Sequence, residues 1–217
     1  MVSHVDIIGA LTYRTRVALN KNLKFHDAAR SSYPFAEVLF DRDRTSMHLW
    51  HFAGTDLEIK NVFERLGKDE QNAKLLFPCI LNYQSVIETH GVGKDGLIQL
   101  DYDLAIATPV DSKWTTEQRS RMAHDNVLEP IYDEFMNQLK RCGWFQIPLQ
   151  GLDFIRAKVF TTGTSEHRVL RVQYGWYVDY IQLVDLRPLL RPTLCDEDIK
   201  TIRREAELVT ADLDKLK

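Results

Sequence analysis

Residues 97 to 108, LIQLDYDLAIAT, constrain the fold of this chain more than any other segment. Apolar side chains stand at every second position: Ile98, Leu100, Tyr102, Leu104 and Ile106. Successive side chains of a β-strand point to opposite faces, so this alternation predicts a strand with one buried face. The other face carries Gln99, Asp101, Asp103 and Ala105. We therefore expect the two aspartates to lie on the solvent side of a sheet.

The same alternation recurs elsewhere and predicts further strands. In residues 76 to 88 the apolar side chains fall on one face, and Pro78 stands near the beginning, where a strand can dispense with one amide donor. Two hairpins are also expected, because β-prone runs flank a polar turn in each case. They cover residues 37 to 52 and 154 to 175, and the second is followed by a strand at 176 to 186.

Spacing and start signals predict helices over about residues 2 to 19, 56 to 66, 115 to 142 and 196 to 217. Thr55 with Glu58 forms a capping box, in which each side chain bonds a free backbone amide at the helix start. Thr115 with Gln118 repeats the pattern. Pro130 lies inside the third helix and has no amide hydrogen to donate, so we expect a kink there.

The order of these elements predicts an α+β fold, with a mainly antiparallel or mixed sheet covered by a long kinked helix and shorter helices. No repeat and no Gly/Ser-rich linker marks a second domain. We expect a single domain over residues 1–195, followed by a terminal amphipathic helix over residues 196–217.

Composition excludes several classes of function. The chain has 217 residues, 44% of them hydrophobic and 27% charged, values typical of one globular domain. A formal net charge of -3 disfavours general binding of nucleic acid, which requires a basic excess. No segment approaches the ~20 apolar residues of a membrane span, so neither export nor membrane insertion is indicated. Cys79, Cys142 and Cys195 are far apart and suit free thiols better than a disulfide or a zinc site.

Four carboxylates raise the alternative of a metal-dependent nuclease: Glu88, Asp101, Asp103 and Asp111. Two aspartates at i and i+2 on one strand face can share a divalent cation. The lysine that such nucleases place shortly after the second carboxylate is missing, since Leu104 and Ala105 follow Asp103. Most exposed carboxylates are solvated charges, so we expect no catalytic residue, no cofactor and no metal. A cytoplasmic protein-interaction module is a further alternative.

Several short motifs resemble those of tail-terminator and head-to-tail connector ring proteins of tailed bacteriophages. These are particularly the proteins of phages and prophages of Bacteroides-like gut bacteria, including crAss-like phages. The resemblance covers about residues 56 to 190. Its motifs are Leu76-Phe77-Pro78, the run from Asp103 to Thr108, Trp114 and Arg119, Val127-Leu128 with Pro130-Ile131-Tyr132, and Tyr174-Gly175 with Asp179.

The resemblance implies a structural virion subunit without enzymatic activity. Such subunits form a closed homo-oligomeric ring in the neck or tail and contact neighbouring portal, connector or tail ring proteins. They assemble in the bacterial cytoplasm, and the axial channel passes DNA without binding it specifically. An acidic wall repels phosphates, so Asp101 and Asp103 are candidates to face that channel. A solvated outer face is an equally good reading of the two aspartates.

The terminal helix carries a narrow apolar seam at steps of three and four: Ile199, Ile202, Ala206, Val209, Leu213 and Leu216. Such a heptad seam suits one facing helix better than a flat sheet. The helix either folds back onto its own sheet or docks on a neighbouring subunit or an adjacent ring, and we favour docking. Deletion of residues 196–217 is then expected to leave a folded domain that assembles poorly.

Overall fold

The computed structural model describes residues 2–33, 35, 39–40, 46–67, 70–93, 95–148, 151–161 and 176–214. Helices account for 48% of the structure and strands of a mixed sheet for 30%, which confirms the α+β class. No helix in these ranges is both long and apolar enough to cross a bilayer.

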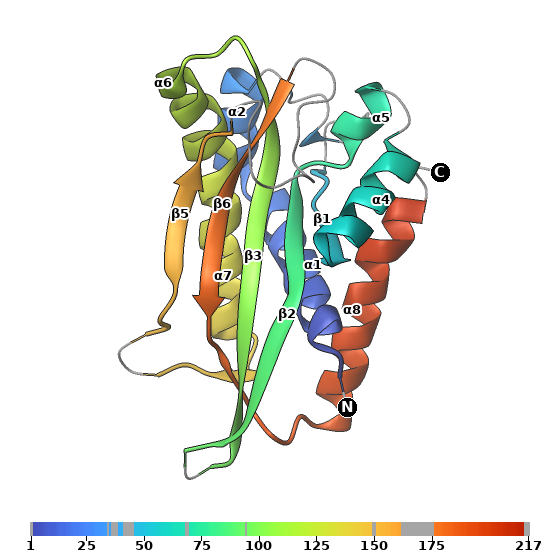
Figure 1. The fold of residues 1–217 in the computed structure, drawn as a ribbon, viewed down its shortest axis with the longest axis vertical. Coiled ribbons are helices and arrows are strands. Elements are labelled where there is room, and N and C mark those ends of the chain that lie inside the picture. Colours follow the sequence, from blue (N-terminus) through green and yellow to red (C-terminus); the bar gives the residue numbers. More distant parts are fainter. Residues whose placement is uncertain are drawn as a thin grey trace.

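The described strands form one seven-stranded sheet. Their bounds are β1 Trp50–Gly54, β2 Cys79–Val92, β3 Leu97–Asp111, β4 Phe145–Gln146, β5 Ile155–Val159, β6 Trp176–Leu186 and β7 Leu189–Leu190. The main order is β1-β2-β3-β6-β5, while the short β7 pairs with both β3 and β4. β1 runs parallel to β2, and the other pairs are antiparallel. β2 and β3 form a long hairpin whose tip extends beyond the helices (Figure 1).

The alternation of β3 is confirmed on its inner face. Leu100, Tyr102, Leu104 and Ile106 are at most 2% exposed and belong to the main core. On the outer face Asp101 and Asp103 keep partial access to solvent, as expected, but Ala105 is buried in a second core. The outer face of the sheet is therefore covered in one half and open in the other.

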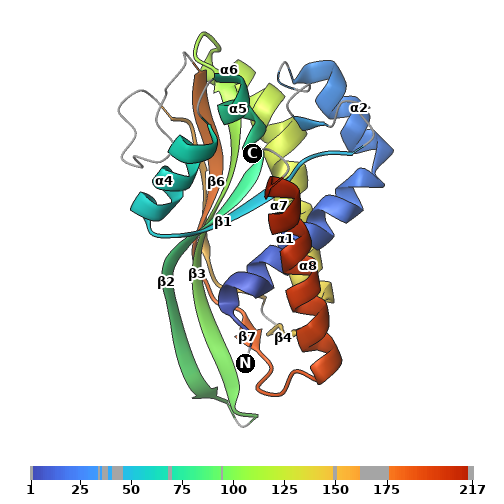
Figure 2. The same cartoon turned by 90° about the vertical axis from the view of Figure 1, so that its right-hand side faces the viewer.

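Two sets of helices produce this division. The inner face packs against α1 (His4–Asn20), α2 (Leu23–Ser32), the long helix over residues 116–141 and α8 (Asp196–Asp214). Figure 2 shows these helices on one side of the sheet. The shorter α4 (Asp56–Leu66) and α5 (Glu70–Leu75) lie on the other side and cover only the half that holds β1.

The helix starts follow the predicted capping boxes. In α4 the Thr55 side chain accepts a hydrogen bond from the Glu58 amide, and the Glu58 carboxylate accepts one from the Thr55 amide. The long helix begins with the same reciprocal pair, made by Thr115 and Gln118. Both sequence predictions are confirmed, because a capping box depends on residues only three positions apart.

The long helix of 26 residues is not uniform. It begins as α6 (Thr116–Arg119), continues as the π-helix η1 (Ser120–Leu128) and ends as α7 (Glu129–Arg141). Pro130 stands in the first turn of α7, where its missing amide hydrogen costs least. The irregularity expected at Pro130 thus takes the form of a wider helical geometry in the preceding residues.

The hairpin expected over residues 37–52 is described only in part. Phe40 and Met47 form an antiparallel bridge, and the His48 amide donates to the Leu39 carbonyl at 2.8 Å, as such a hairpin requires. The strand that follows, β1, also pairs in parallel with β2, with Trp50 opposite Cys79, which the sequence did not indicate. Residues 41–45 at the expected turn lie outside the described residues, as does the expected strand at 168–175. Local alternation indicates a strand but not its partner, which is decided by tertiary packing.

Candidate functional site

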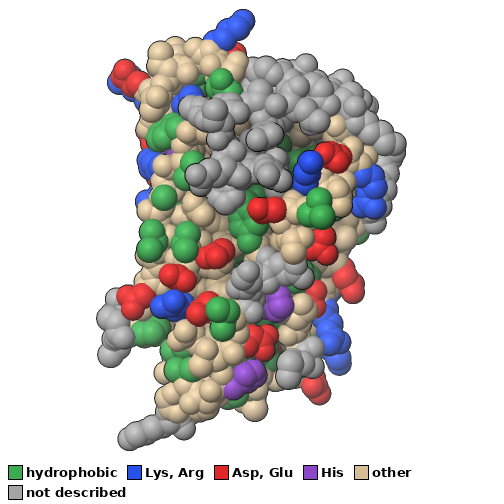
Figure 3. Space-filling view, viewed as in Figure 1, with side chains coloured by type: hydrophobic (Ala, Val, Ile, Leu, Met, Phe, Trp, Pro, Cys, Tyr) green, Lys and Arg blue, Asp and Glu red, His purple; other side chains and the backbone are tan. Residues whose placement is uncertain are grey.

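The open half of the outer sheet face combines exposed apolar and charged side chains. We define this open face by the side chains of Ile87, Asp101, Asp103, Ile155, Asp185 and Arg187, which come from four strands or their ends. Ile87 and Ile155 are 61% and 62% exposed. Figure 3 shows hydrophobic, acidic and basic side chains mixed over this side of the molecule. Contact surfaces commonly combine exposed apolar and charged side chains, and single exposed apolar residues also occur on the surfaces of monomers.

Asp101 and Asp103 lie together on this open face, as the alternation of β3 predicts. Asp101 accepts a hydrogen bond from Gln99 Nε2 at 2.9 Å and pairs with Arg187 Nε at 3.4 Å. Asp103 accepts a hydrogen bond from the backbone amide of Asp185 at 3.1 Å. Arg187 also lies 3.3 Å from Asp185. One guanidinium pairs with two of the three carboxylates, so the side chains that define the open face carry a net negative charge.

The four carboxylates of the nuclease alternative are not brought together. Glu88 pairs in register with the buried Leu100 and so points to the face opposite Asp101. Asp111 stands at the far end of β3 and accepts a hydrogen bond from the Lys113 amide at 2.8 Å, as a turn residue does. Within the described part of the chain, no three His, Cys, Asp or Glu side chains are grouped as a metal site requires. The geometry gives this alternative no shared site.

A buried ion pair joins the long helix to the sheet. Arg119, from the end of α6, contacts both carboxylate oxygens of Asp179 on β6. Arg119 is 5% exposed and Asp179 is fully buried. The backbone carbonyl of Thr161 accepts a further hydrogen bond from Arg119 at 2.8 Å, and the Thr161 amide donates to Asp179 at 3.0 Å. Every charged group of this cluster is partnered, which is how buried charges become tolerable.

His124, in the π-helix, lies beside this ion pair. Its Nε2 is 3.8 Å from Asp179, and its ring packs on Phe160 with the centroids 4.5 Å apart. Neither ring nitrogen has a hydrogen-bond partner among the described residues. Burial lowers the pKa of His124 to about 4, so the ring is neutral at pH 7. A neutral histidine against a paired carboxylate supports packing.

The apolar seam of the terminal helix packs within its own chain, which corrects the docking interpretation of residues 196–217. Ile202 is fully buried in the main core and Val209 is 2% exposed. Ile199 and Ala206 are half-buried. The side chain of Leu213 and all of Leu216 lie outside the described residues. The seam does face a helix, as the heptad spacing predicts, but that helix is α1 of the same chain.

Close approach makes the contact between α1 and α8 possible. A Cβ atom on Gly9 would lie 3.1 Å from the Ala206 Cβ, so only glycine fits at this crossing without a shift. Next to it, Arg14 Nε donates to Glu205 at 2.7 Å, and both side chains are largely buried. The deletion expected to leave the domain intact would therefore remove part of its core.

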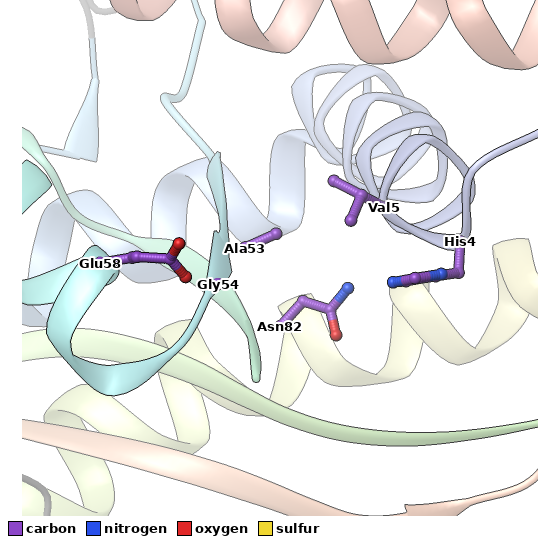
Figure 4. Close-up of a pocket in the computed structure, with 6 residues that line it drawn as sticks. All are labelled: His4, Val5, Ala53, Gly54, Glu58 and Asn82. Atoms are coloured by element: carbon purple, nitrogen blue, oxygen red, sulfur yellow. The ribbon is translucent and has the colours of Figure 1, made fainter. Parts of the chain in front are cut away.

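A cleft that the sequence did not indicate lies where α1, β1, β2 and α4 meet. Its volume is about 490 Å³, and its lining includes the buried side chain of Asn82 and the carboxylate of Glu58 (Figure 4). Asn82 stands on the inner face of β2. The sequence around it indicates a strand and gives no sign of a binding site. No sequence signal connects it to Glu58, because the two meet through the parallel pairing of β1 with β2.

Comparison of the chain with models of protein families, with curated proteins and with solved structures finds no match.

Proposed function

We propose that this protein is a structural subunit that forms a closed ring in the neck or tail of a tailed bacteriophage, without enzymatic activity. The observation that carries the proposal is the open face. It lies on a rigid sheet and exposes two large isoleucines beside a surplus of carboxylates. A protein whose task is contact with other subunits requires such a surface and requires no catalytic group.

The buried ion pair also supports a structural role. Arg119 and Asp179 are two of the residues on which the resemblance to phage ring proteins rests. They stand 60 positions apart and contact each other in the core. Arg119 thereby fixes the head of the long helix to β6 inside the core. Residues that hold a helix on a sheet serve stability and precise shape.

The sheet offers different surfaces at its two ends, which a ring requires. β5 pairs with β6 along one side, and among the described strands none pairs with its other side. At the opposite end β1 is covered by α4. Contacts between unlike surfaces repeat from copy to copy until a ring closes. In this arrangement Ile155, on the edge strand β5, contacts a neighbour, and Asp101 and Asp103, on the inner strand β3, face the axial channel.

The channel assignment follows from charge. DNA binds proteins mainly through cations placed on its phosphates, and it releases bound counterions when it does so. A wall with three carboxylates and one guanidinium offers the opposite sign, so a duplex slides past it without being held. The net charge of -3 for the whole chain is in keeping with this.

The decisive experiment is a measurement of mass and symmetry on the native particle. Electron microscopy of virions, together with native mass spectrometry of the purified chain, is expected to show a cyclic assembly of identical subunits. Rings of this kind commonly need a preceding layer as a template, so the particle is the stronger of the two measurements. A chain that is monomeric both at high concentration and inside its native particle contradicts the proposal.

The nuclease alternative has a separate test. Purified protein is incubated with supercoiled plasmid in the presence of Mg²⁺ or Mn²⁺, next to the Asp101→Ala, Asp103→Ala double variant. We expect no cleavage by either protein. Cleavage by the wild-type chain that is lost in the double variant would replace the structural proposal by an enzymatic one.

A further inference from the structure

The cleft between the first turns of α1 and α4 has the size of a small-molecule site. Its volume of about 490 Å³ falls in the range of roughly 300–1,000 Å³ that such sites occupy. The lining residues are His4, Val5, Ala53, Gly54, Glu58 and Asn82. Figure 4 shows Asn82 extending from β2 toward His4, with Glu58 on the other side of Gly54.

Asn82 is the buried polar group of this cleft. Asn82 is 2% exposed, and its carboxamide oxygen has no hydrogen-bond partner among the described residues. Buried polar groups in folded proteins nearly always have a partner, so an unpaired one points to a water or ligand that completes it. A half-turn about the terminal bond exchanges the oxygen and the nitrogen of a carboxamide, so either end can face the cleft.

Glu58 supplies a fixed negative charge. Its Oε2 accepts hydrogen bonds from the Thr55 amide at 2.8 Å and from Thr55 Oγ1 at 3.0 Å. These bonds, the backbone bond first, lower the pKa of the Glu58 carboxyl and keep it ionised. Because both bonds go to Oε2, the other oxygen remains for a ligand. Gly54 has φ +142, and a Cβ there would lie 2.8 Å from Glu58 Oε2, so glycine makes room for the carboxylate.

The charges around the cleft decide the sign of its ligand. Two helix N-termini meet here, and each carries about half a positive charge, which alone would favour an anion. Both ends already have caps, from Ser3 and Thr55. Their first turns carry whole negative charges on Asp6, Asp56 and Glu58, of which Glu58 lines the cleft. Full charges outweigh the half charges of the helix ends, so the cleft favours a cation.

We propose that this cleft binds an organic cation, a primary ammonium or guanidinium group, with Glu58 as its counter-charge and Asn82 as a hydrogen-bond acceptor. Both groups donate several hydrogen bonds and accept none, which matches the carboxylate and carboxamide oxygens. Val5 and Ala53 line the cleft with apolar atoms that suit an alkyl stem. The inference does not depend on the proposed ring function.

The test is a titration of the full chain, followed by NMR, with butylguanidinium and butylammonium chloride. 1-Butanol is the neutral probe of similar shape. We expect saturable shifts of the Gly54 and Glu58 amide signals and of the Asn82 side-chain amide with the cations, and no saturable shift with 1-butanol. Absence of saturable shifts with both cations, or equal shifts with 1-butanol, overturns the proposal.

Paired variants locate the binding. Glu58→Gln keeps the capping box, which accepts glutamine as well as glutamate, but removes the charge. It is expected to weaken cation binding roughly fivefold, as for one charge pair in a wet site. Glu64→Gln removes the same charge from the same helix, where Glu64 pairs with Lys60 and does not line the cleft, and is expected to leave binding unchanged. Equal affinity in the wild type and Glu58→Gln contradicts the proposal.

Asn82→Asp provides a second, independent variant. It preserves the shape of the side chain and adds a carboxylate, so it is expected to strengthen cation binding. A loss of binding by a variant that is still folded contradicts the role of Asn82.

Sedimentation then identifies the source of the cation. If the group is a side chain of a second copy, excess butylguanidinium shifts the chain to smaller species. Unchanged sedimentation with saturable binding identifies a free small molecule.

Discussion

Arg119 on the long helix and Asp179 on β6 form a bidentate ion pair, in which both carboxylate oxygens contact the guanidinium. The pair is nearly out of solvent, and its remaining hydrogen-bonding capacity goes to the backbone of Thr161. The ion pair and its hydrogen bonds thus connect the end of α6, the strand β6 and the residues that follow β5.

Neutralising Asp179 is expected to be strongly destabilising. Asp179→Asn leaves the buried Arg119 guanidinium without a counter-charge, which typically costs about 3–5 kcal/mol in the free energy of unfolding. The measurement is urea denaturation followed by circular dichroism. Asp185→Asn is the matched control, since Asp185 is an exposed carboxylate on the same strand, and it should change stability by less than about 1 kcal/mol. Similar losses in both variants would show that the pair contributes little.

The terminal helix is expected to stabilise the domain to which it belongs. Ile202→Ala removes buried atoms from the main core and should cost about 2–5 kcal/mol. Leu208→Ala, on the same helix but 40% exposed, should cost less than about 1 kcal/mol. Equal small losses in the two variants would mean that α8 detaches from α1 in solution, which would restore the docking interpretation.

Local sequence signals predicted local structure well. The alternation in residues 97–108 identified the buried face of β3, and two capping boxes marked the starts of α4 and the long helix. Each of these signals depends on residues that are neighbours in the chain. The position of Asp101 and Asp103 on the solvent side of the sheet follows from the same short-range regularity.

Partners between distant segments could not be predicted. The heptad seam of α8 indicated that a helix faces it, but nothing in the spacing says that the helix is α1 of the same chain rather than one from a neighbour. Gly9 is the residue that permits the contact, and in the sequence it only weakened the prediction of α1. The ion pair of Arg119 with Asp179 and the cleft at Asn82 likewise arise from tertiary packing.

His51 is expected to make stability depend on pH. It lies on β1 at the inner face, and burial lowers its pKa to about 4. The unfolded chain then binds a proton below about pH 6.5 that the folded chain does not bind until about pH 4, so stability falls as pH drops through this window. The loss is roughly 3 kcal/mol for a shift of this size.

The measurement is urea denaturation of wild type and His51→Leu at several values between pH 7 and pH 4. The variant should lose less stability than the wild type over this window, because leucine does not titrate. His90→Leu is the control, since it makes the same replacement at a side chain that is 58% exposed. An identical pH slope in wild type and His51→Leu would argue that His51 titrates normally.

The exposed isoleucine of β5 is expected to matter for assembly and not for folding. Ile155→Asp places a charge on the open face and should leave the melting temperature within a few degrees of the wild type while it reduces ring formation in native mass spectrometry. Leu57→Asp is the control, because Leu57 is 65% exposed on α4, away from the open face. Normal rings in Ile155→Asp would remove this surface from the proposed contact.

The strand pairing of the β2–β3 hairpin differs in stability along its length. Near Cys79 its strands are hydrogen-bonded on both sides, to β1 and β6. From Ile87 to Val92, β2 pairs only with β3 among the described strands, while β3 there also pairs with the two-residue strand β7. A strand paired on one side opens more easily than a strand paired on both, so amide hydrogens of β2 toward the tip exchange with solvent through local fraying, while those at the base exchange only when more of the sheet separates. One continuous strand thus contains a firmly held half and a half that opens locally.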